Sequence, residues 1–315
     1  MSARRRTARR RPVTALVGGG GLARAFLPGL LAAGYPVRAL AARTLGSARR
    51  AIAGRPGIRA TSSALKAARG AELILLAVPD RELAGLARVL AQGLKGRLER
   101  CVVLHHAGAL GLEPLQPLAR ARAAVGVLHP LQSLAPRSRS ASLLVGAHAR
   151  VEGDRRAAAL ARRLARDLGL KPFSLRAGLS ASDRGAYHAA ASLASNDLVA
   201  LLSLAVRLMT RIGLEPGQAR AALVPLARGT LAQIEREGLA HALTGPVVRG
   251  DADTLAAQLR RLRGLSGEAA DVHRLLALEL LGIARASRRL SPAQTRALRR
   301  ALRAPAAGRG RRAGV

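Results

Sequence analysis

The stretch YHAAASLASN, residues 187–196, carries four polar side chains that a helix would bring to one face. Each residue of an α-helix advances by about 100°, so these four fall within roughly 100° of arc, opposite alanines and leucines: His188, Ser192, Ser195 and Asn196. Histidine is the side chain most easily poised to give up a proton near neutral pH. We predict that His188 is a proton donor, that Asn196 hydrogen-bonds the reacting group, and that both serines help to bind a substrate. A histidine and serines that only pack at a domain interface are the alternative.

A second cluster, HPLQS at residues 129–133, follows an apolar stretch and contains a proline that stiffens the chain. His129 is an alternative proton donor, and Gln132 offers hydrogen bonds to a substrate. His105 ends another apolar stretch. We expect no metal site from His105, His106 and His129, because neither an acid-and-histidine spacing on one helix nor a pair of thiolates supports one.

The third cluster is ALTGPVVRGD, residues 242–251, where glycine and proline fix a loop between helices. We predict that Thr244 and Arg249 bind the substrate there. A guanidinium grips a carboxylate through two parallel hydrogen bonds, so Arg249 points to a substrate that carries a carboxylate. An ion pair between Arg249 and Asp251 that only stabilises the loop is an equal alternative.

The first half of the chain alternates apolar stretches with helical patterns. Strands are predicted over 13–18, 36–43, 58–62, 71–79, 101–109, 123–133 and 142–153, and helices over 22–34, 82–94 and 154–169. Such alternation indicates an α/β domain with a doubly wound parallel sheet. After about residue 181 only helical periods remain, over 181–212, 217–238, 252–263, 267–288 and 291–303. We therefore predict that an all-helical domain follows the sheet domain.

Between the first strand and the first helix lies a G-x-G-x-x-A pattern. It places Gly18 at the tight turn, Gly20 and Gly21 where the backbone approaches a pyrophosphate, and Ala23 where the helix packs closely on the strand. A flexible glycine linker is the alternative, and the periodic flanking segments argue against it. The pattern therefore predicts a dinucleotide-binding domain of the Rossmann-like type over 12–176, with the helical domain over 177–304 and disordered tails over 1–11 and 305–315.

The end of the second strand predicts which dinucleotide binds. An enzyme that uses NAD usually has an acidic residue there for the ribose hydroxyl, whereas this chain has Arg43 and Thr44 and no acid nearby. A guanidinium suits the 2′-phosphate of NADP, although arginine is common enough in this chain to stand there by chance. We expect Val78, Pro79 and His105 to border the nicotinamide half, whose carboxamide is a second possible partner for Asn196.

Composition limits the other readings. The net charge of +35 resembles that of a nucleic-acid-binding protein, but only three lysines are present, and arginine spread along the whole chain is typical of a GC-rich genome. Aromatic residues for base stacking are scarce, so we expect only non-specific attraction to polyanions. The lone Cys101 favours a reducing cytoplasm. No uncharged apolar stretch approaches the roughly 20 residues of a membrane span, so we expect no membrane segment.

Five stretches together resemble a known family: LHHAGAL (104–110), LHPLQSL (128–134), VEGD (151–154), YHAAASLASN (187–196) and ALTGPVVRGD (242–251). They are similar to the Rossmann-like proteins whose C-terminal half is the domain of unknown function 2520. That family resembles pyrroline-5-carboxylate reductase and ketopantoate reductases in plan. The family usually has His-Thr-Ser-Gly after the fifth strand, and this chain has His-His-Ala-Gly at 105–108, so any role of that serine is lost or moved.

The resemblance implies an NADPH-dependent reductase of a small ketone or imine that carries a carboxylate, with ketopantoate as the leading substrate. The missing serine keeps a second hypothesis open, a protein that senses a dinucleotide or serves as a scaffold without turnover. We also expect a homodimer in which the helix over 181–212 pairs with a second copy.

Overall fold

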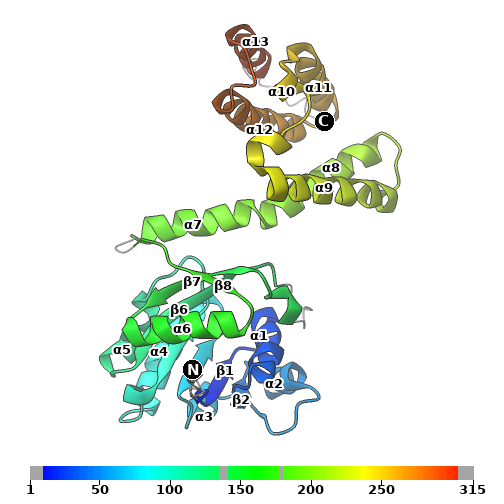
Figure 1. Ribbon diagram of the computed structural model, residues 1–315. Helices are drawn as coiled ribbons and strands as arrows, with labels where there is room; N and C mark the ends of the chain where they lie inside the picture. The colour runs from blue at the N-terminus through cyan, green and yellow to red at the C-terminus, as the bar shows by residue number, and fades with distance from the viewer. Residues whose placement is uncertain (1–9, 135–140, 177–179, 304–315) are drawn as a thin grey trace, which may run out of the picture. The chain divides into compact units, whose positions relative to one another are not determined.

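The computed structural model describes residues 10–134, 141–176 and 180–303 (Figure 1). The chain forms two compact units, Met1–Ser195 and Asn196–Val315. The predicted division between residues 176 and 177 marks the change from sheet to helices, and the first compact unit extends beyond it through one further helix, α7 (Ala181–Leu193).

The first unit is built on one eight-stranded sheet with the strand order β3-β2-β1-β4-β5-β6-β7-β8. Its strands are β1 (Thr14–Val17), β2 (Val37–Ala41), β3 (Arg59–Thr61), β4 (Leu73–Leu76), β5 (Val102–His105), β6 (Ala124–Leu131), β7 (His148–Gly153) and β8 (Lys171–Phe173). The first six strands are parallel and follow the order 3-2-1-4-5-6 of a Rossmann fold. The predicted fold class, a doubly wound sheet domain followed by helices, is confirmed.

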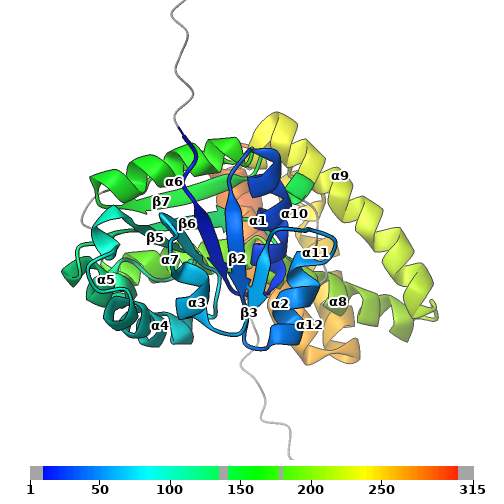
Figure 2. The ribbon, with the colours of Figure 1, turned by 90° about the horizontal axis from the view of Figure 1, so that it is seen from below.

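Helices cover both faces of this sheet, and Figure 2 shows the strands between α6 and α4. They are α1 (Gly21–Ala32), α2 (Leu45–Ile52), α3 (Ala64–Ala68), α4 (Asp80–Gly93), α5 (Gln116–Arg120) and α6 (Arg155–Asp167). In the central strands, alternate residues belong to two separate cores. Leu16 and Leu75 pack with α1, α2 and α6 on one face, whereas Val17 and Leu76 pack with α3, α4 and α5 on the other. All four residues of β4 are buried, as a central parallel strand requires.

The far edge of the sheet differs from the prediction. Strand β7 runs antiparallel to β6, and β8, which was not predicted, pairs with β7. The strand predicted over 142–153 begins only at His148, because the preceding residues form a short 3₁₀ helix (Ala141–Leu143) and a turn at Gly146 with φ of 81°. The antiparallel register places His129 directly opposite Arg150, which becomes important for the candidate site.

Both predicted tails lie mostly outside the described residues. Arg10 and Arg11 are described, and the disorder predicted for them is wrong. Arg10 forms an ion pair with Glu72, just before β4, and Arg11 forms one with Asp167 at the end of α6. These pairs hold the chain just before β1 against the sheet domain.

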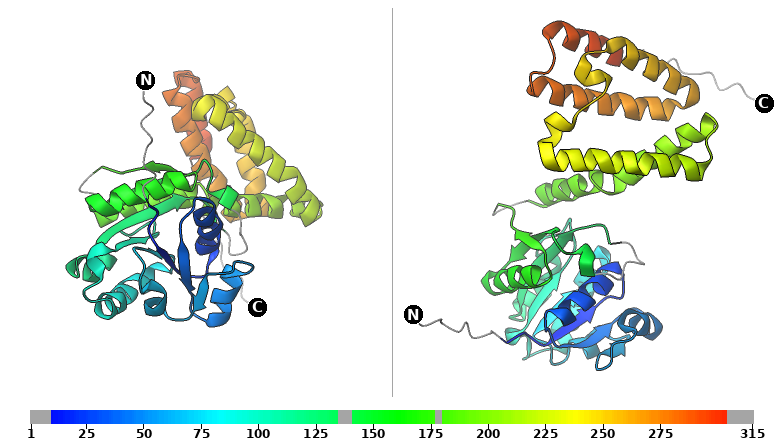
Figure 3. Two further views of the ribbon diagram at one scale, coloured as in Figure 1. Left: turned by 60° about the horizontal axis from the view of Figure 1, so that its bottom comes forward. Right: turned by 45° about the vertical axis from the view of Figure 1, so that its right-hand side comes forward.

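The second unit is helical throughout the part that the structure describes. Its helices are α8 (Asn196–Arg211), α9 (Pro216–Ala242), α10 (Pro246–Arg249), α11 (Ala252–Leu265), α12 (Gly267–Ala286) and α13 (Pro292–Leu302). Leu255, Leu281 and Leu298 belong to the core shared by α10–α13. Helices α8 and α9 lie side by side (Figure 3), and α8 has no buried residue.

The single helix predicted over 181–212 is divided. Helix α7 ends at Leu193, and a turn at Ala194 and Ser195 precedes α8. By length and composition alone, the segment Ala181–Arg211 is apolar enough to cross a membrane, with a mean hydropathy of 1.6 over its best window. Its first part, α7, instead contacts the sheet domain through Arg184 and Tyr187, as described below.

Candidate active site

The glycine loop has the geometry that a dinucleotide phosphate needs. Gly18 has φ of 127°, and a Cβ atom there would lie 2.0 Å from the carbonyl oxygen of Ala77, so only glycine fits. A Cβ at Gly20 would meet nothing within 4 Å, which leaves the approach to the loop open. Gly20 is the N-cap of α1 with no side-chain cap, and the first turn, from Gly21, contains no acidic residue. The N–H groups of this turn can therefore bind an anion.

Three further residues that we predicted on the cofactor side adjoin this loop. Ala23 is fully buried where α1 packs on the sheet. Val78 is half-buried and follows Ala77, the residue that contacts Gly18, while Pro79 is exposed as the N-cap of α4. The loop and the end of β4 thus lie together, and the contact of Val78 and Pro79 with a nicotinamide stays a prediction.

The end of β2 lies beside the same loop. A Cβ at Gly19 would be 3.0 Å from the Cβ of Ala42, the residue before Arg43. Arg43 is exposed and forms no ion pair with any residue that the structure describes, so its guanidinium is available to a phosphate. Thr44 caps α2 by accepting a hydrogen bond from the backbone N–H of Ser47. Its hydroxyl therefore organises the turn that carries Arg43.

Two imidazoles converge at the loop that follows β5. The rings of His129 and His188 lie 6.4 Å apart, centroid to centroid. A Cβ at Gly108 would lie 2.5 Å from Nδ1 of His188 and 2.9 Å from Nε2 of His129. Both nitrogens therefore lie against the same face of Gly108, in the space that a side chain would need, so only glycine lets the two rings come this close.

Tyr187 fixes the orientation of His129. Its hydroxyl lies 2.9 Å from Nδ1 of His129, and its pKa is raised to about 12, mainly by burial, so the hydroxyl keeps its proton. Burial first, and then the charge of Arg150, lower the pKa of His129 to about 4, so this imidazole is neutral at pH 7. With the hydroxyl assigned as the donor to Nδ1, the ring proton lies on Nε2, next to Gly108.

His105 and His106 hold the loop rather than face that space. The Nε2–H of His105 donates to the carbonyl of Gly111 at 2.6 Å, and Nδ1 accepts from the backbone N–H of Ala107. The structure thus occupies both nitrogens of His105, which we predicted to contact the cofactor. His106 is bonded through Nδ1 to the carbonyl of Leu128, and burial lowers its pKa to about 3.

Two buried arginines that sequence reasoning missed pin the same loop. The Arg150 side chain donates to the carbonyls of Ala107 and Leu110. Arg184, on α7, is paired with Glu113. Neither was predicted, because a buried arginine in so arginine-rich a sequence carries no distinguishing pattern. Tyr187 had a weak signal, as one of the few aromatic residues and the neighbour of His188.

Of the remaining predicted substrate residues, Gln132, Ser192 and Ser195 belong to the first unit. Gln132 is exposed and braces its own loop, because its amide donates to the carbonyl of Leu143 and accepts from the N–H of Ser133. Ser192 and Ser195 are half-buried at the end of the first unit.

The other predicted residues, Asn196, Thr244 and Arg249, are exposed in the second unit, and their roles stay predictions. The Arg249–Asp251 ion pair is not among those formed by the described residues; Asp251 caps α11 instead. Those residues also contain no group of three or more metal-ligating side chains.

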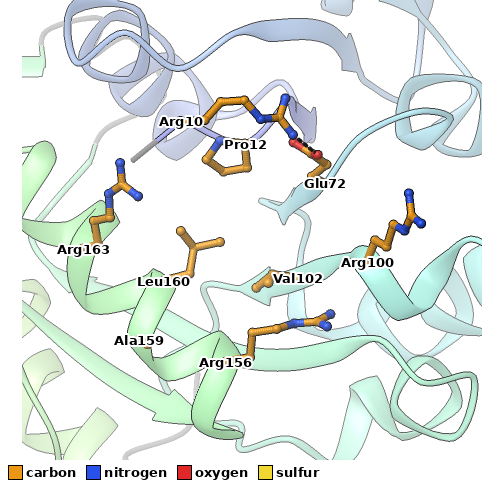
Figure 4. A pocket seen from close by; sticks show the side chains of 9 residues that line it. All are labelled: Arg10, Pro12, Glu72, Arg100, Val102, Arg156, Ala159, Leu160 and Arg163. Atoms are coloured by element: carbon orange, nitrogen blue, oxygen red, sulfur yellow. Dashed lines mark hydrogen bonds and ion pairs between the residues drawn. The ribbon is translucent and has the colours of Figure 1, made fainter. Parts of the chain in front are cut away.

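A cavity of about 400 Å³ lies at the amino ends of the strands β1, β4 and β5 (Figure 4). It is lined by Arg10, Pro12, Glu72, Arg100, Val102, Arg156, Ala159, Leu160 and Arg163. Arg10 is paired with Glu72, and Arg156 donates to the carbonyls of Glu99 and Cys101. Ligands of open α/β sheets bind at the carboxyl ends of the strands, where the glycine loop and the two imidazoles lie, so this cavity is separate from the candidate site.

Comparison with known families decides the classification. Residues 4–130 match the model of the Rossmann-like domain, and residues 147–280 match the domain of unknown function 2520. The chain belongs to the Rossmann-like proteins with a DUF2520 domain. In this DUF2520 protein both imidazoles of the candidate site come from family-matched segments, His129 from the first and His188 from the second.

Solved structures share the fold at low sequence identity. A Thermotoga maritima protein is 24% identical, with 88% of this chain and 100% of that chain covered and a TM-score of 0.64. Pyrroline-5-carboxylate reductase from Coxiella burnetii is 16% identical, with 86% and 99% covered and a TM-score of 0.58. Pyrroline carboxylate reductase from Plasmodium falciparum, solved with NADP bound, is 10% identical, with 87% and 98% covered and a TM-score of 0.56. None of the curated protein sequences matches the chain.

Proposed function

We propose that this DUF2520 protein is an NADPH-dependent reductase of a small ketone or imine that carries a carboxylate. The observation that carries the proposal is the convergence of His129 Nε2 and His188 Nδ1 above Gly108. The glycine loop and Arg43 support NADPH as the cofactor, and so does the fold shared with a pyrroline carboxylate reductase that binds NADP. The bound cofactor would supply the hydride.

The two histidines have different roles: one holds the substrate by a hydrogen bond, and the other delivers the proton. His129 is neutral at pH 7 and presents an N–H, which suits a fixed hydrogen bond to the oxygen or nitrogen being reduced. His188 is exposed, so its imidazole can exchange protons with water and deliver one to that atom. Because Gly108 has no side chain, the two nitrogens can come close enough to contact the same reacting group.

We further propose that the protein is a cytoplasmic homodimer. Large apolar side chains are exposed on three helices of the second unit: Val199 on α8, Val224, Leu226, Leu231 and Leu239 on α9, and Leu275, Leu276 and Leu278 on α12. A second copy that packs on α8 and α9 would remove the exposed side chains of these two helices from water. Sedimentation at micromolar concentration tests this: we expect twice the monomer mass of 32.7 kDa, and a monomer would refute it.

The test of activity is NADPH oxidation, followed by its absorbance, with a panel of ketopantoate, other 2-oxo acids and cyclic imino acids. We expect saturable oxidation with at least one member and none with the same compounds lacking the carboxylate. NADPH that binds without being oxidised by any member of the panel would refute a reductase.

One observation favours a second function, a sensor that binds the dinucleotide without turnover. Ala107 stands where the family usually has serine, is buried, and offers no hydroxyl. Tight NADPH binding that does not change in a His188→Ala variant, with no turnover, would support the sensor.

A further inference from the structure

Arg150 is among the most deeply buried side chains of the protein, although it carries a full charge. It is 1% exposed, on strand β7. Taking a charge out of water costs free energy unless hydrogen bonds and an opposite charge replace the water. Nη1 lies 2.8 Å from Oε2 of Glu152, and Nη2 lies 2.7 Å from the carbonyl of Leu110 and 3.3 Å from that of Ala107. The guanidinium is therefore engaged with one carboxylate and with the loop after β5.

The same guanidinium also lies close to Tyr187, the residue that orients His129. Its carbon lies 5.4 Å from the centroid of the Tyr187 ring, within cation–π range. In the antiparallel register Arg150 is the direct cross-strand partner of His129, so both side chains leave the sheet on the same face. One side chain thus contacts the loop that carries Gly108 and the tyrosine that orients His129.

We propose that Arg150 is a positioning residue of this site: it fixes the backbone of residues 107–110 and the ring of Tyr187, so that His129 Nε2 stays aimed at the space above Gly108. This inference rests on the proposed function for its catalytic meaning, but its structural part is independent of any substrate. The hydrogen bonds of Arg150 go to Glu152, Ala107 and Leu110 through Nη1 and Nη2, and its buried Nε has no hydrogen-bond partner among the described residues, so Arg150 supports the loop and does not bind the reacting group.

Arg150 also acts on His129 through its charge. Five titratable groups act on this imidazole: Arg150 from β7, Tyr187 and His188 from α7, His105 from β5, and His106 just after β5. After burial, the positive charge of Arg150 is the largest cause that keeps the pKa of His129 low. Removing that charge must therefore raise the pKa of His129, because its imidazolium would no longer be repelled.

The experiment compares Arg150→Met and Arg150→Lys with the wild-type full chain by NMR titration of the imidazoles, with His129→Gln to assign the signal. In Arg150→Met we expect the His129 titration to move upward by about one pH unit or more. In Arg150→Lys the charge remains but the planar fork is lost, so we expect the titration to stay low while the Ala107 amide exchanges with solvent at least about tenfold faster.

Arg156→Lys is the matched control, because Arg156 also donates to two backbone carbonyls, those of Glu99 and Cys101, at the opposite edge of the sheet. It should leave both readouts unchanged. A folded Arg150→Met with an unmoved His129 titration would overturn the proposal. If Arg150→Met does not fold, unchanged exchange of the Ala107 amide in Arg150→Lys would overturn it.

These readouts need no turnover, so they separate this proposal from the proposed function. If the wild type reduces a substrate, Arg150→Lys should also lower kcat about a hundredfold, as a misplaced reacting group does, with the affinity for NADPH unchanged. An unaltered kcat beside faster loop exchange would show that Arg150 is structural only.

Discussion

His129 on β6 and His188 on α7 are 59 residues apart in the chain, yet their rings lie 6.4 Å apart. Gly108 explains how both can face one space, because a Cβ there would fall within 3 Å of a nitrogen of each ring. The pair lies at the carboxyl ends of the parallel strands, where α/β domains bind their ligands.

Gly108→Ala should close this space. The backbone of Gly108 does not need a left-handed conformation, so the added methyl group is the whole perturbation. We expect about a hundredfold loss of turnover and a loss of about 1–3 kcal/mol in the free energy of unfolding. Gly185→Ala on α7 is the control, since a Cβ there meets nothing within 4 Å. Wild-type turnover in Gly108→Ala would contradict the site.

Tyr187→Phe should free His129 from its fixed tautomer, because the hydroxyl that bonds Nδ1 is removed. We expect the ¹⁵N shifts of the His129 ring to show a mixture of both neutral tautomers, and turnover to fall by about tenfold. Tyr35→Phe is the matched control, since that hydroxyl bonds Asp167, away from the two histidines. A single unchanged tautomer in Tyr187→Phe would mean that another group orients the ring.

Much of this arrangement follows from the sequence, and the reasons for the rest are physical. The G-x-G-x-x-A pattern and the apolar stretches predicted the sheet and the phosphate loop, because both depend on local backbone requirements. His129 and His188 were chosen by residue type. Their proximity depends on the antiparallel pairing of β6 with β7 and on the position of α7. The direction of a strand cannot be predicted from its apolar residues alone.

Other features left no pattern to find. The turn at Ala194 and Ser195 divides a segment whose residues all suit a helix, so helical periodicity predicted one continuous helix. Arg150 is buried by tertiary contacts alone. His105 was expected at the cofactor, but the backbone of the β5 loop satisfies both of its nitrogens.

Arg43→Ala should weaken NADPH binding and spare NADH. A hydrogen bond to a charged group is worth about 1.5–3 kcal/mol, so we expect the Kd of NADPH to rise by about tenfold or more. Arg38→Ala removes an exposed arginine from β2, the strand that precedes Arg43, and should change neither affinity. Calorimetry with both dinucleotides measures this, and an equal loss for NADH would show that Arg43 does not recognise the 2′-phosphate.

Acid should destabilise the protein through His106. Burial lowers the pKa of His106 from its usual value of 6.5 to about 3, so between these values the unfolded chain binds the proton that the folded chain does not. The free energy of unfolding then falls as the pH falls, by about 1.4 kcal/mol per pH unit from this group. In His106→Gln, urea unfolding between pH 6 and pH 4 should show a slope smaller by about that amount. An identical slope would mean that His106 is protonated in the folded state.

The most direct test of the central claim compares NADPH oxidation by the wild type and by His188→Gln, with NADPH affinity measured on both. The account predicts a substrate in the carboxylate panel that the wild type reduces, a loss of about 10²–10⁴-fold in His188→Gln, and equal NADPH affinity. Equal rates in the two proteins would contradict the assignment of His188 as the proton donor.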